Sequence, residues 1–402
     1  MLAYAGLHVD RSTILTNSDE LVDHLRFLNA LHDRGALDLG KKYPVSADFG
    51  GLYTNITQED LREKKRIMAR LAHAYKDSMM KDEYDTFNPN NLPNSRRSKS
   101  GVVRLLLPIF NHPANKPAKW VKGPVPDEEM AGYVLWTIDE FDENVDIVID
   151  QCHLVFGGSI YKMEIGFPMG TASGPALADV YLLYYELSFM LRKFDEQNRT
   201  GKKMPRVCFE LIVYLKRYID DLFFLAERDD DSWKDYLFDR RTTNGSDGIY
   251  PTNLARNDGT IIDQPLTLEV AAPKLSVEFL DLLVILRKLR EGAWRFDWKL
   301  YDKRNEMAIF AGMRKFPHPD AVLDSGVKSR VLPNEIGRFD RRTSKPSDLR
   351  EATLRHCQSF LDHGYPHHMV VSKVKGYPAA RDVKGNWKES LIYIQKRLAK
   401  MS

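Results

Sequence analysis

Three aspartates in this sequence stand where apolar segments end, and together they could hold metal ions. Asp48 follows a short β-favouring segment, while Asp220 and Asp221 lie between two apolar runs, residues 207–215 and 222–226. A carboxylate at the end of a hydrophobic strand is costly unless a cation or a hydrogen-bond donor meets it. If the strand that ends at Asp48 lies beside a hairpin that carries Asp220 and Asp221, the three carboxylates converge and repel one another. Divalent metal relieves such repulsion, and hard oxygen ligands suit Mg²⁺ held together with substrate phosphates.

Two Mg²⁺ ions about 4 Å apart are suited to in-line phosphoryl transfer. One ion lowers the pKa of an attacking hydroxyl group, and the other stabilises the leaving pyrophosphate. An Asp-Asp pair by itself is more typical of a solvated turn. The chemical interpretation therefore depends on the flanking apolar runs and on the position of Asp48.

The composition limits the class of protein. The chain has 402 residues, of which 43% are hydrophobic and 29% charged, and this balance excludes a largely disordered or collagen-like protein. The length predicts two or three subdomains. We expect no membrane span, because no segment approaches the roughly 18–20 consecutive apolar residues that one requires, and no secretory signal. Cys152, Cys208 and Cys357 lie far apart, which argues against a disulfide framework or a Cys-type zinc site and predicts an intracellular protein.

Charge is distributed unevenly along the chain. The net charge is +3, but residues 287–402 contain 25 Lys and Arg against 13 Asp and Glu. A basic C-terminal third indicates a polyanionic partner for that part. The alternative is a solvated helical surface with no partner.

Patterning predicts the elements that position the aspartates. A helix begins with Ser18 as its N-cap, a buried strand covers residues 42–49, and Thr57 caps a long amphipathic helix that runs to residue 80. We interpret residues 81–126 as an insertion or long surface loop around an apolar patch. The remaining expectations are one or two helices within 127–156, a buried helix at 174–194, strands at 207–215 and 222–226, a short helix at 232–240, strands at 266–270, 277–286 and 294–301, and helices after residue 347.

Four segments resemble the catalytic motifs of reverse transcriptases, in the order that this family has. They are SADFGGLYTNI (46–56), GFPMGTASGPALAD (166–179), RYIDD (217–221) and FLDL (279–282). The LYTNI ending is typical of the Penelope-like retroelement branch, which is similar to telomerase. Downstream, FPHP (316–319), Arg330 and GYP (364–366) are similar to spaced signatures of the same branch.

This resemblance implies an α+β fold, the right-hand polymerase. It implies partial fingers or a lead-in at residues 1–45, and a palm at 46–290 in which an antiparallel sheet packs with helices. A fingers-type insertion would occupy about 81–126, and a basic, helical, thumb-like region would follow at 291–402.

The resemblance also assigns roles to the aspartates and their neighbours. Asp48 and Asp220 would be the principal ligands of two Mg²⁺ ions, for which Mn²⁺ could substitute. Asp221 would be a secondary ligand, and the backbone carbonyl of Phe49 a further one. Tyr53 would lie beneath the incoming sugar and exclude a 2′-hydroxyl group by steric clash. The alternative for Tyr53 is a packed core ring.

Further residues would contact the nucleotide or the nucleic acid. Pro168, Met169 and Gly170 would form a loop at the new base pair, with Met169 alternatively a core filler, and Lys274 is a candidate general acid to the pyrophosphate. The expected primer and template contacts are Tyr218 near the primer terminus and, at backbone phosphates, Lys216, Arg217, Lys303, Arg304 and Arg330. For Lys216 and Arg217 a plain surface charge is the alternative.

The resemblance implies RNA-directed DNA synthesis from an RNA template, a DNA or RNA primer and dNTPs, without a membrane partner. Family analogy places such a protein in the nucleus, and the sequence identifies no protein partner. A nucleic-acid-binding protein derived from a reverse transcriptase is an alternative, because only about 45 residues precede Asp48 and they offer a poor grip for a triphosphate. An RNA-dependent RNA polymerase is a second alternative, against which Tyr53 argues.

Overall fold

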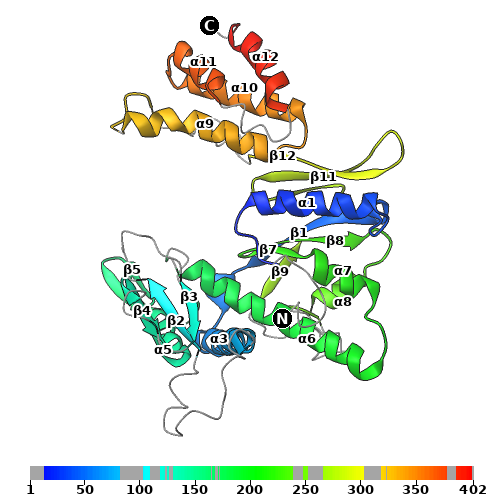
Figure 1. The fold of residues 1–402 in the computed structure, drawn as a ribbon, viewed down its shortest axis with the longest axis vertical. Helices are drawn as coiled ribbons and strands as arrows, with labels where there is room; N and C mark the ends of the chain where they lie inside the picture. The colour runs from blue at the N-terminus through cyan, green and yellow to red at the C-terminus, as the bar shows by residue number, and fades with distance from the viewer. Residues whose placement is uncertain are drawn as a thin grey trace. The chain divides into compact units, whose positions relative to one another are not determined.

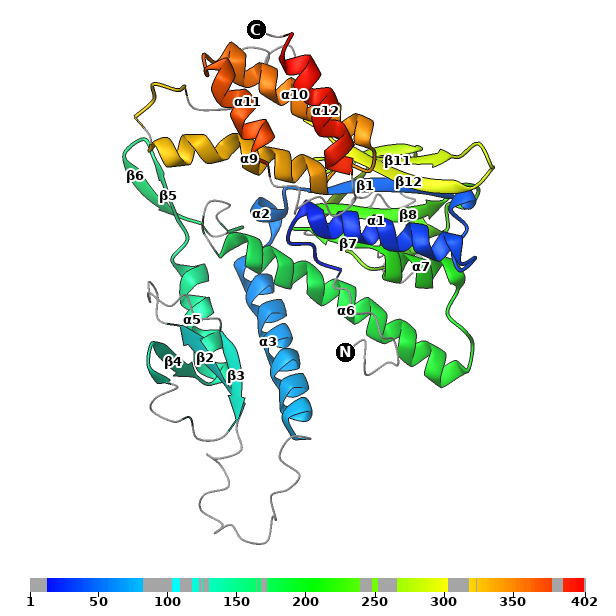
Figure 2. The ribbon, with the colours of Figure 1, turned by 45° about the horizontal axis from the view of Figure 1, so that its top comes forward.

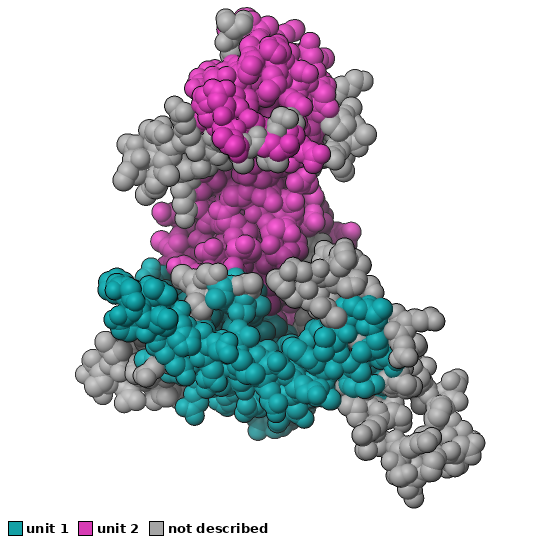
Figure 3. All heavy atoms as spheres, turned by 90° about the vertical axis from the view of Figure 1, so that its left-hand side faces the viewer, with its two compact units in different colours: residues 1–11, 49–208, 234–269 teal, residues 12–48, 209–233, 270–402 magenta. Residues whose placement is uncertain are grey.

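The computed structural model describes most of the chain, and the described residues form a mixed α/β structure with antiparallel strand pairs. It describes residues 13–81, 103–108, 118–122, 125, 130–163, 165–167, 171, 173–238, 248–251, 266–302, 318–322, 324–377 and 386–400. Two compact units interleave along the sequence (Figure 3). Unit 1 contains Met1–Arg11, Phe49–Cys208 and Lys234–Glu269, and unit 2 contains Ser12–Asp48, Phe209–Trp233 and Val270–Ser402. None of the described helices is long and apolar enough to cross a bilayer.

A four-stranded sheet is built around strand β8 (Asp221–Glu227). It pairs antiparallel with β1 (Lys42–Gly50) on one side and with β7 (Lys216–Tyr218) on the other, and the strand order is β7-β8-β1-β9, with β9 at Thr267–Val270. The apolar run of β8 is 0–5% exposed at every position from 222 to 226, as expected for a strand covered on both faces. The predicted strand at 42–49 is confirmed.

Helix α1 (Ser18–Asp33) and a second sheet share one hydrophobic core with β8 (Figure 1). The second sheet consists of β10 (Ser276–Phe279), β11 (Leu282–Lys288) and β12 (Trp294–Leu300), paired antiparallel in that order. Buried side chains alternate with more exposed ones along β10 and β11, which is the pattern of a sheet with one covered face, whereas Phe296, Asp297 and Trp298 of β12 are all buried.

Four C-terminal helices form a separate core within unit 2. They are α9 (Ser325–Arg341), α10 (Pro346–Asp362), α11 (His367–Lys375) and α12 (Asn386–Leu398). Ser344 joins them to β12, because its backbone N–H donates to the carbonyl of Trp298 and its hydroxyl oxygen accepts from the Trp298 N–H. The helices expected after residue 347 are confirmed, whereas α9 was not predicted.

Ion pairs also tie α9 to the strands and to α1. Arg342, just after α9, binds Asp19 through Nε and Asp281 through Nη1, each at 2.6 Å. Arg341 and Arg338 add contacts to Asp19 and Asp281, respectively. Burial alone would raise the pKa of Asp19, but hydrogen bonds and the positive charge of Arg342 and Arg341 outweigh burial and lower it.

Unit 1 is organised by two long helices that pack together, α3 (Gln58–Lys81) and α6 (Gly174–Thr200) (Figure 2). The hydroxyl of Tyr181 on α6 donates to the Asp60 carboxylate on α3 at 2.6 Å. On another face of α3, Lys65 forms ion pairs with Asp142 and Asp146 of α5 (Ile138–Asp150).

Other elements of the structure are η1 (Leu39–Lys41), α2 (Leu52–Asn55), β2 (Val103–Pro108), β3 (Lys119–Lys122), β4 (Tyr133–Trp136), β5 (His153–Phe156), β6 (Ser159–Lys162), α7 (Arg206–Tyr214) and α8 (Trp233–Leu237).

Several expectations about the elements were wrong. The apolar run at 207–215 forms helix α7 rather than a strand, so the strand that precedes the aspartates is the shorter β7. Part of the expected loop at 81–126 folds into the sheet β3-β2-β4, and 127–156 includes strands besides α5. The expected strand at 277–286 is a hairpin that turns at Leu280 and Asp281.

The N-cap of α1 was also misplaced by one residue. The side chain of Asn17 accepts from the N–H groups of Asp19 and Glu20. Ser18 instead donates its hydroxyl to Asp281, 263 residues away in sequence. Local pattern could not distinguish these two roles. The predicted cap of α3 is confirmed, since Thr57 Oγ1 accepts from the Asp60 N–H.

We predict that Arg342→Gln lowers the free energy of unfolding by about 2 kcal/mol, because it removes two charge-assisted hydrogen bonds from a partly buried network. Arg355→Gln is the matched control. It breaks an exposed i,i+4 pair with Glu351 and should cost less than about 0.5 kcal/mol. Urea titrations followed by circular dichroism measure both variants, and equal losses would contradict the structural role of the network.

Candidate active site

The three predicted metal-binding aspartates all lie at one end of the β1–β8 pair. The register of these strands runs over seven residue pairs, from Lys42 opposite Glu227 to Asp48 opposite Asp221. Directly opposed residues of an antiparallel pair project their side chains from the same face, with Cβ atoms roughly 5 Å apart. The expectation that Asp48 lies beside the aspartate hairpin is therefore confirmed.

Asp220 occupies the two-residue turn that joins β7 to β8, in which Tyr218 pairs with Asp221. The first turn residue, Ile219, has φ 57°, a left-handed conformation that is unfavourable for a β-branched side chain. A positive φ at the first central position alone is the pattern of a type II′ turn, which usually has glycine there. Such strain costs of order 1–3 kcal/mol and persists only where the surroundings enforce it.

Arg217 is part of those surroundings. Its side chain is completely buried, and its Nη1 donates to the Ile219 carbonyl at 3.0 Å. The backbone of Arg217 is bonded on its outer side, since its N–H donates to the Thr13 carbonyl and its carbonyl accepts from the Leu15 N–H. The turn that presents Asp220 is thus held from both sides.

The electrostatics of the turn favour a bound cation. Burial, followed by repulsion from Asp48, raises the pKa of the Asp220 carboxyl, although a local backbone hydrogen bond opposes the shift. A carboxyl with a raised pKa destabilises the fold while it is ionised, so its unfavourable contribution is present at neutral pH and is relieved as pH falls. A divalent cation relieves the same repulsion at neutral pH. Among the described residues, no Lys or Arg forms an ion pair with Asp48 or Asp220.

The donor set fits Mg²⁺, but the side chains are not assembled as a finished metal site. Within the described part of the chain, no group of three or more His, Cys, Asp or Glu side chains is placed to hold a metal ion. The carboxylates are hard oxygen donors of the kind that Mg²⁺ prefers. The roles of Asp48, Asp220, Asp221 and the Phe49 carbonyl as ligands remain predictions.

A buried ion-pair group fixes the opposite end of the β1–β8 pair. Lys42, 1% exposed, bonds through Nζ to Glu227 on β8 and to Glu210 on α7. A shift of one residue in register would remove Lys42 from Glu227 and would turn Asp48 to the other face of the sheet. The Lys42 group therefore positions the aspartates from six residues away. Sequence reasoning missed it because the two glutamates lie 168 and 185 residues from Lys42.

In unit 1, the first two motifs lie in contact. The Tyr53 ring packs on Phe167 with centroids 4.9 Å apart and is 6% exposed. The Tyr53 carbonyl accepts from the Phe167 N–H, and the Ile56 carbonyl accepts from the Gly166 N–H. This burial favours the core-packing alternative for Tyr53, and its role at the sugar remains a prediction.

Two of the expected phosphate contacts are wrong. Lys216 is 3% exposed and Arg217 is 0% exposed, so neither side chain offers its charge to a nucleic acid. Both lie on β7, which is covered on one side by β8 and at its edge by residues 13–15. The same burial argues against the alternative of a plain surface charge at these two positions.

The other expected contacts have varied positions. Lys274 lies in the exposed connection between β9 and β10, Arg330 is exposed on α9, and Tyr218 is half-buried against the core of unit 2. The Phe49 ring packs edge-on against Tyr250. Pro168, Met169, Gly170, Lys303 and Arg304 lie outside the described residues.

Comparison with known proteins gave only distant similarities. No protein-family model and no curated protein matches the sequence. The structure is similar to telomerase from Candida albicans in complex with a TWJ fragment of telomeric RNA, with a TM-score of 0.45 and 12% identity over 99% of this chain and 54% of that one. It is also similar to apo telomerase from Candida tropicalis, with a TM-score of 0.40 and 12% identity over 97% of this chain and 54% of that one. The chain thus spans about half the length of these proteins, and likeness at this level carries no argument about its activity.

We predict that Gly166→Ala destabilises the protein by about 2–4 kcal/mol. The added Cβ would lie 2.3 Å from the Tyr53 carbonyl oxygen, at a residue whose φ is 82°, so steric overlap adds to backbone strain. Gly201→Ala is the control, because Gly201 has φ 67° but nothing within 4 Å of its Cβ position, and should cost about 1 kcal/mol. Thermal unfolding compares them, and similar melting temperatures would contradict the contact between the two motifs.

We predict that Lys42→Met lowers the free energy of unfolding by about 3–5 kcal/mol, because it leaves the buried Glu210 and the partly buried Glu227 without their cation. Adding Glu210→Gln and Glu227→Gln to Lys42→Met should restore most of the loss, since no buried charge then remains. Chemical denaturation of the single and triple variants measures this coupling. A triple variant that is no more stable than Lys42→Met would show that the three side chains do not act together.

Proposed function

We propose that this protein is an RNA-directed DNA polymerase of the Penelope-like retroelement branch, which adds dNMP to a primer 3′-hydroxyl. The observation that supports this most is the register that places Asp48 opposite Asp221, with Asp220 in the adjoining strained turn. These residues occupy the positions at which reverse-transcriptase motifs carry their carboxylates. Burial and then repulsion from Asp48 raise the Asp220 pKa, and a bound cation would relieve both effects.

In this proposal Asp48 and Asp220 hold two Mg²⁺ ions, and Asp221 orients or supplements them. The metal ions would supply a lowered pKa for the attacking hydroxyl group and charge neutralisation at the pyrophosphate. The protein itself supplies position, because the buried β8 strand and the Arg217-supported turn fix where the carboxylates lie. Phosphoryl transfer depends chiefly on such positioning and on electrostatic stabilisation.

Sugar selection is assigned to Tyr53, whose ring would exclude a 2′-hydroxyl group. The ring is buried against Phe167, so this role requires the nucleotide to reach its edge. The RNA template and the primer would be held largely through phosphates, and the proposed contacts in the C-terminal third are Lys303, Arg304 and Arg330. Nuclear location remains part of the proposal by family analogy.

The alternative of a protein that binds nucleic acid without catalysis has one observation in its favour. The described residues hold no ready group of three metal ligands. The two functions differ in whether Asp220 is needed for nucleotide addition, and primer extension separates them.

We predict that the wild-type protein extends a primer on an RNA template in Mg²⁺ or Mn²⁺, and that Asp220→Asn lowers the rate at least a hundredfold, because metal ions provide several kcal/mol of charge stabilisation in such reactions. Asp229→Asn removes the same charge from an exposed position and should extend at the wild-type rate. Gel-based extension with dNTPs, and in parallel with rNTPs, provides the measurement.

The outcomes discriminate between the candidates. Extension by Asp220→Asn at the wild-type rate refutes the metal assignment. Duplex binding without extension by any variant favours the binding-only function. Equal use of rNTPs and dNTPs would contradict the role assigned to Tyr53 and would favour an RNA polymerase.

A further inference from the structure

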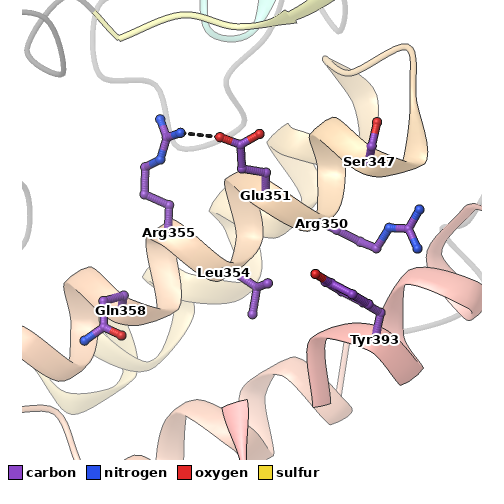
Figure 4. Close-up of a pocket in the computed structure, with 7 residues that line it drawn as sticks. All are labelled: Ser347, Arg350, Glu351, Leu354, Arg355, Gln358 and Tyr393. Carbon is purple, nitrogen blue, oxygen red and sulfur yellow. Dashed lines mark hydrogen bonds and ion pairs between the residues drawn. The ribbon is translucent and has the colours of Figure 1, made fainter. Parts of the chain in front are cut away.

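A recess of about 620 Å³ lies between α10 and α12 in the C-terminal helices of unit 2 (Figure 4). Its lining residues come from one stripe of α10 and from a single position of α12. They are Ser347, Arg350, Glu351, Leu354, Arg355, Gln358 and Tyr393. Leu354 packs partly into the helical core and forms an apolar floor, while the remaining lining residues are polar or aromatic. The volume is in the range of ordinary ligand pockets.

Two guanidinium groups lie near the Tyr393 ring, one from Arg350 in the lining of the recess and one from Arg397 beside it. The Arg350 guanidinium carbon lies 5.2 Å from the ring centroid, reaching across from α10, and that of Arg397 lies 5.7 Å from the same centroid. Tyr393 is 39% exposed. Two guanidinium groups thus share one aromatic ring that remains open to solvent.

These two arginines differ from the arginines at the C-terminal end of α9. Arg338, Arg341 and Arg342 are paired with carboxylates in the network around Asp19 and Asp281. By contrast, no described carboxylate forms an ion pair with Arg350 or Arg397, and the only hydrogen bond that Arg350 donates there is from Nε to the Pro346 carbonyl. No described carboxylate neutralises this pair of cations, so their positive charge can attract an anionic ligand.

We infer that the α10–α12 recess binds a single-stranded segment of nucleic acid, separately from the aspartate site. Arg350 and Arg397 contact the phosphodiester backbone, and an unstacked base packs against the Tyr393 ring or the guanidinium planes beside it. This combination of a cationic surface with an aromatic platform is how proteins hold single strands without reading sequence. Ser347 and Gln358 add neutral hydrogen-bonding groups at the rim.

A duplex fits the recess less well than a single strand. Bases in a duplex are paired and stacked inside the helix, whereas single strands can present a base to an aromatic side chain. An acidic peptide fits less well too, because it offers carboxylates but no planar group for the exposed Tyr393 ring, and Glu351 lies at the rim. Both become outcomes of the test.

The test measures binding of a fluorescein-labelled single-stranded RNA of about 12 nucleotides to the full chain by fluorescence anisotropy, without Mg²⁺ or dNTPs. Arg350→Gln/Arg397→Gln should raise the dissociation constant at least tenfold. It should also reduce the slope of log K against log salt by about 1.4, which corresponds to two phosphate contacts on a single strand. Tyr393→Leu should raise the dissociation constant about tenfold through lost stacking.

Lys375→Gln/Lys400→Gln is the matched control, because it removes two positive charges from exposed positions outside the recess. It should change the dissociation constant less than about threefold. Circular dichroism melting verifies that each variant is folded, and Tyr393→Leu, at an exposed position, provides the test if the double arginine variant unfolds.

Three results would overturn the inference. The first is unchanged RNA affinity in Arg350→Gln/Arg397→Gln and Tyr393→Leu, or a loss of affinity no greater than that of the control variant. The second is an equal loss of affinity for a blunt RNA–DNA duplex, which would make the surface a duplex contact. The third is displacement of the RNA by polyglutamate at equal charge concentration, which would make it a peptide site. Because the assay contains no metal or nucleotide, failure of the proposed polymerase activity leaves these readings unaffected.

Discussion

Repulsion between like charges at the end of one strand pair is the constraint on which the rest of this structure depends. Antiparallel pairing brings Asp48 opposite Asp221, and the adjoining turn adds Asp220, whose pKa is raised by burial and by the Asp48 charge. Carboxylates do not lie this close together unless the fold holds them, because the free energy of each would be lower if it were fully hydrated. The holding forces are the burial of residues 222–226 of β8 and the Lys42 ion pairs that fix the register. Stability is thus concentrated away from the aspartates and opposes the repulsion between them.

A second hairpin in the same unit shows which features of the aspartate turn indicate function. Leu280, at the turn between β10 and β11, has φ 56°, and Asp281 follows it, just as Asp220 follows Ile219. Asp281, however, is neutralised by Arg342 and accepts the Ser18 hydroxyl. Backbone strain and an aspartate are therefore shared by a structural turn and by the candidate active site. The difference lies in charge compensation, since Asp220 has no described cation within ion-pair distance.

Sequence reasoning was successful where the signal is local or periodic. The strand ending at Asp48, the helix capped by Thr57, the aspartate turn and the second-sheet strand β12 all follow from runs of apolar residues with clear ends. It failed at residues 207–215, where an apolar run without periodicity suits a buried strand or a buried helix equally well. It failed again at 277–286, where a hairpin turn is built from leucine and aspartate rather than from glycine or asparagine.

The burial of single charges could not be predicted from the sequence either, for a physical reason. Lys42, Lys216 and Arg217 lie in or beside short strands, where a charge ordinarily indicates a solvent-exposed position. The partners of Lys42 come from segments far away in sequence, and Arg217 donates to the backbone carbonyl of Ile219. Local pattern contains no information about such partners. A buried cation is tolerable only with such partners. Whether a given Lys or Arg is a buried structural residue can therefore be recognised only once the fold is known.

Ion pairing also determines how much of the positive charge in the C-terminal third is available to a partner. Counting charges over residues 287–402 gives a large positive balance, but a count treats every arginine alike. In the structure, Arg338, Arg341 and Arg342 are used to join helices to strands, and their charge is largely cancelled by Asp19 and Asp281. What can attract a polyanion is the remainder, such as Arg350, which lies beside an exposed aromatic ring without a carboxylate among the described residues. Net charge thus overestimates the interaction surface, and the pairing of each cation determines where that surface lies.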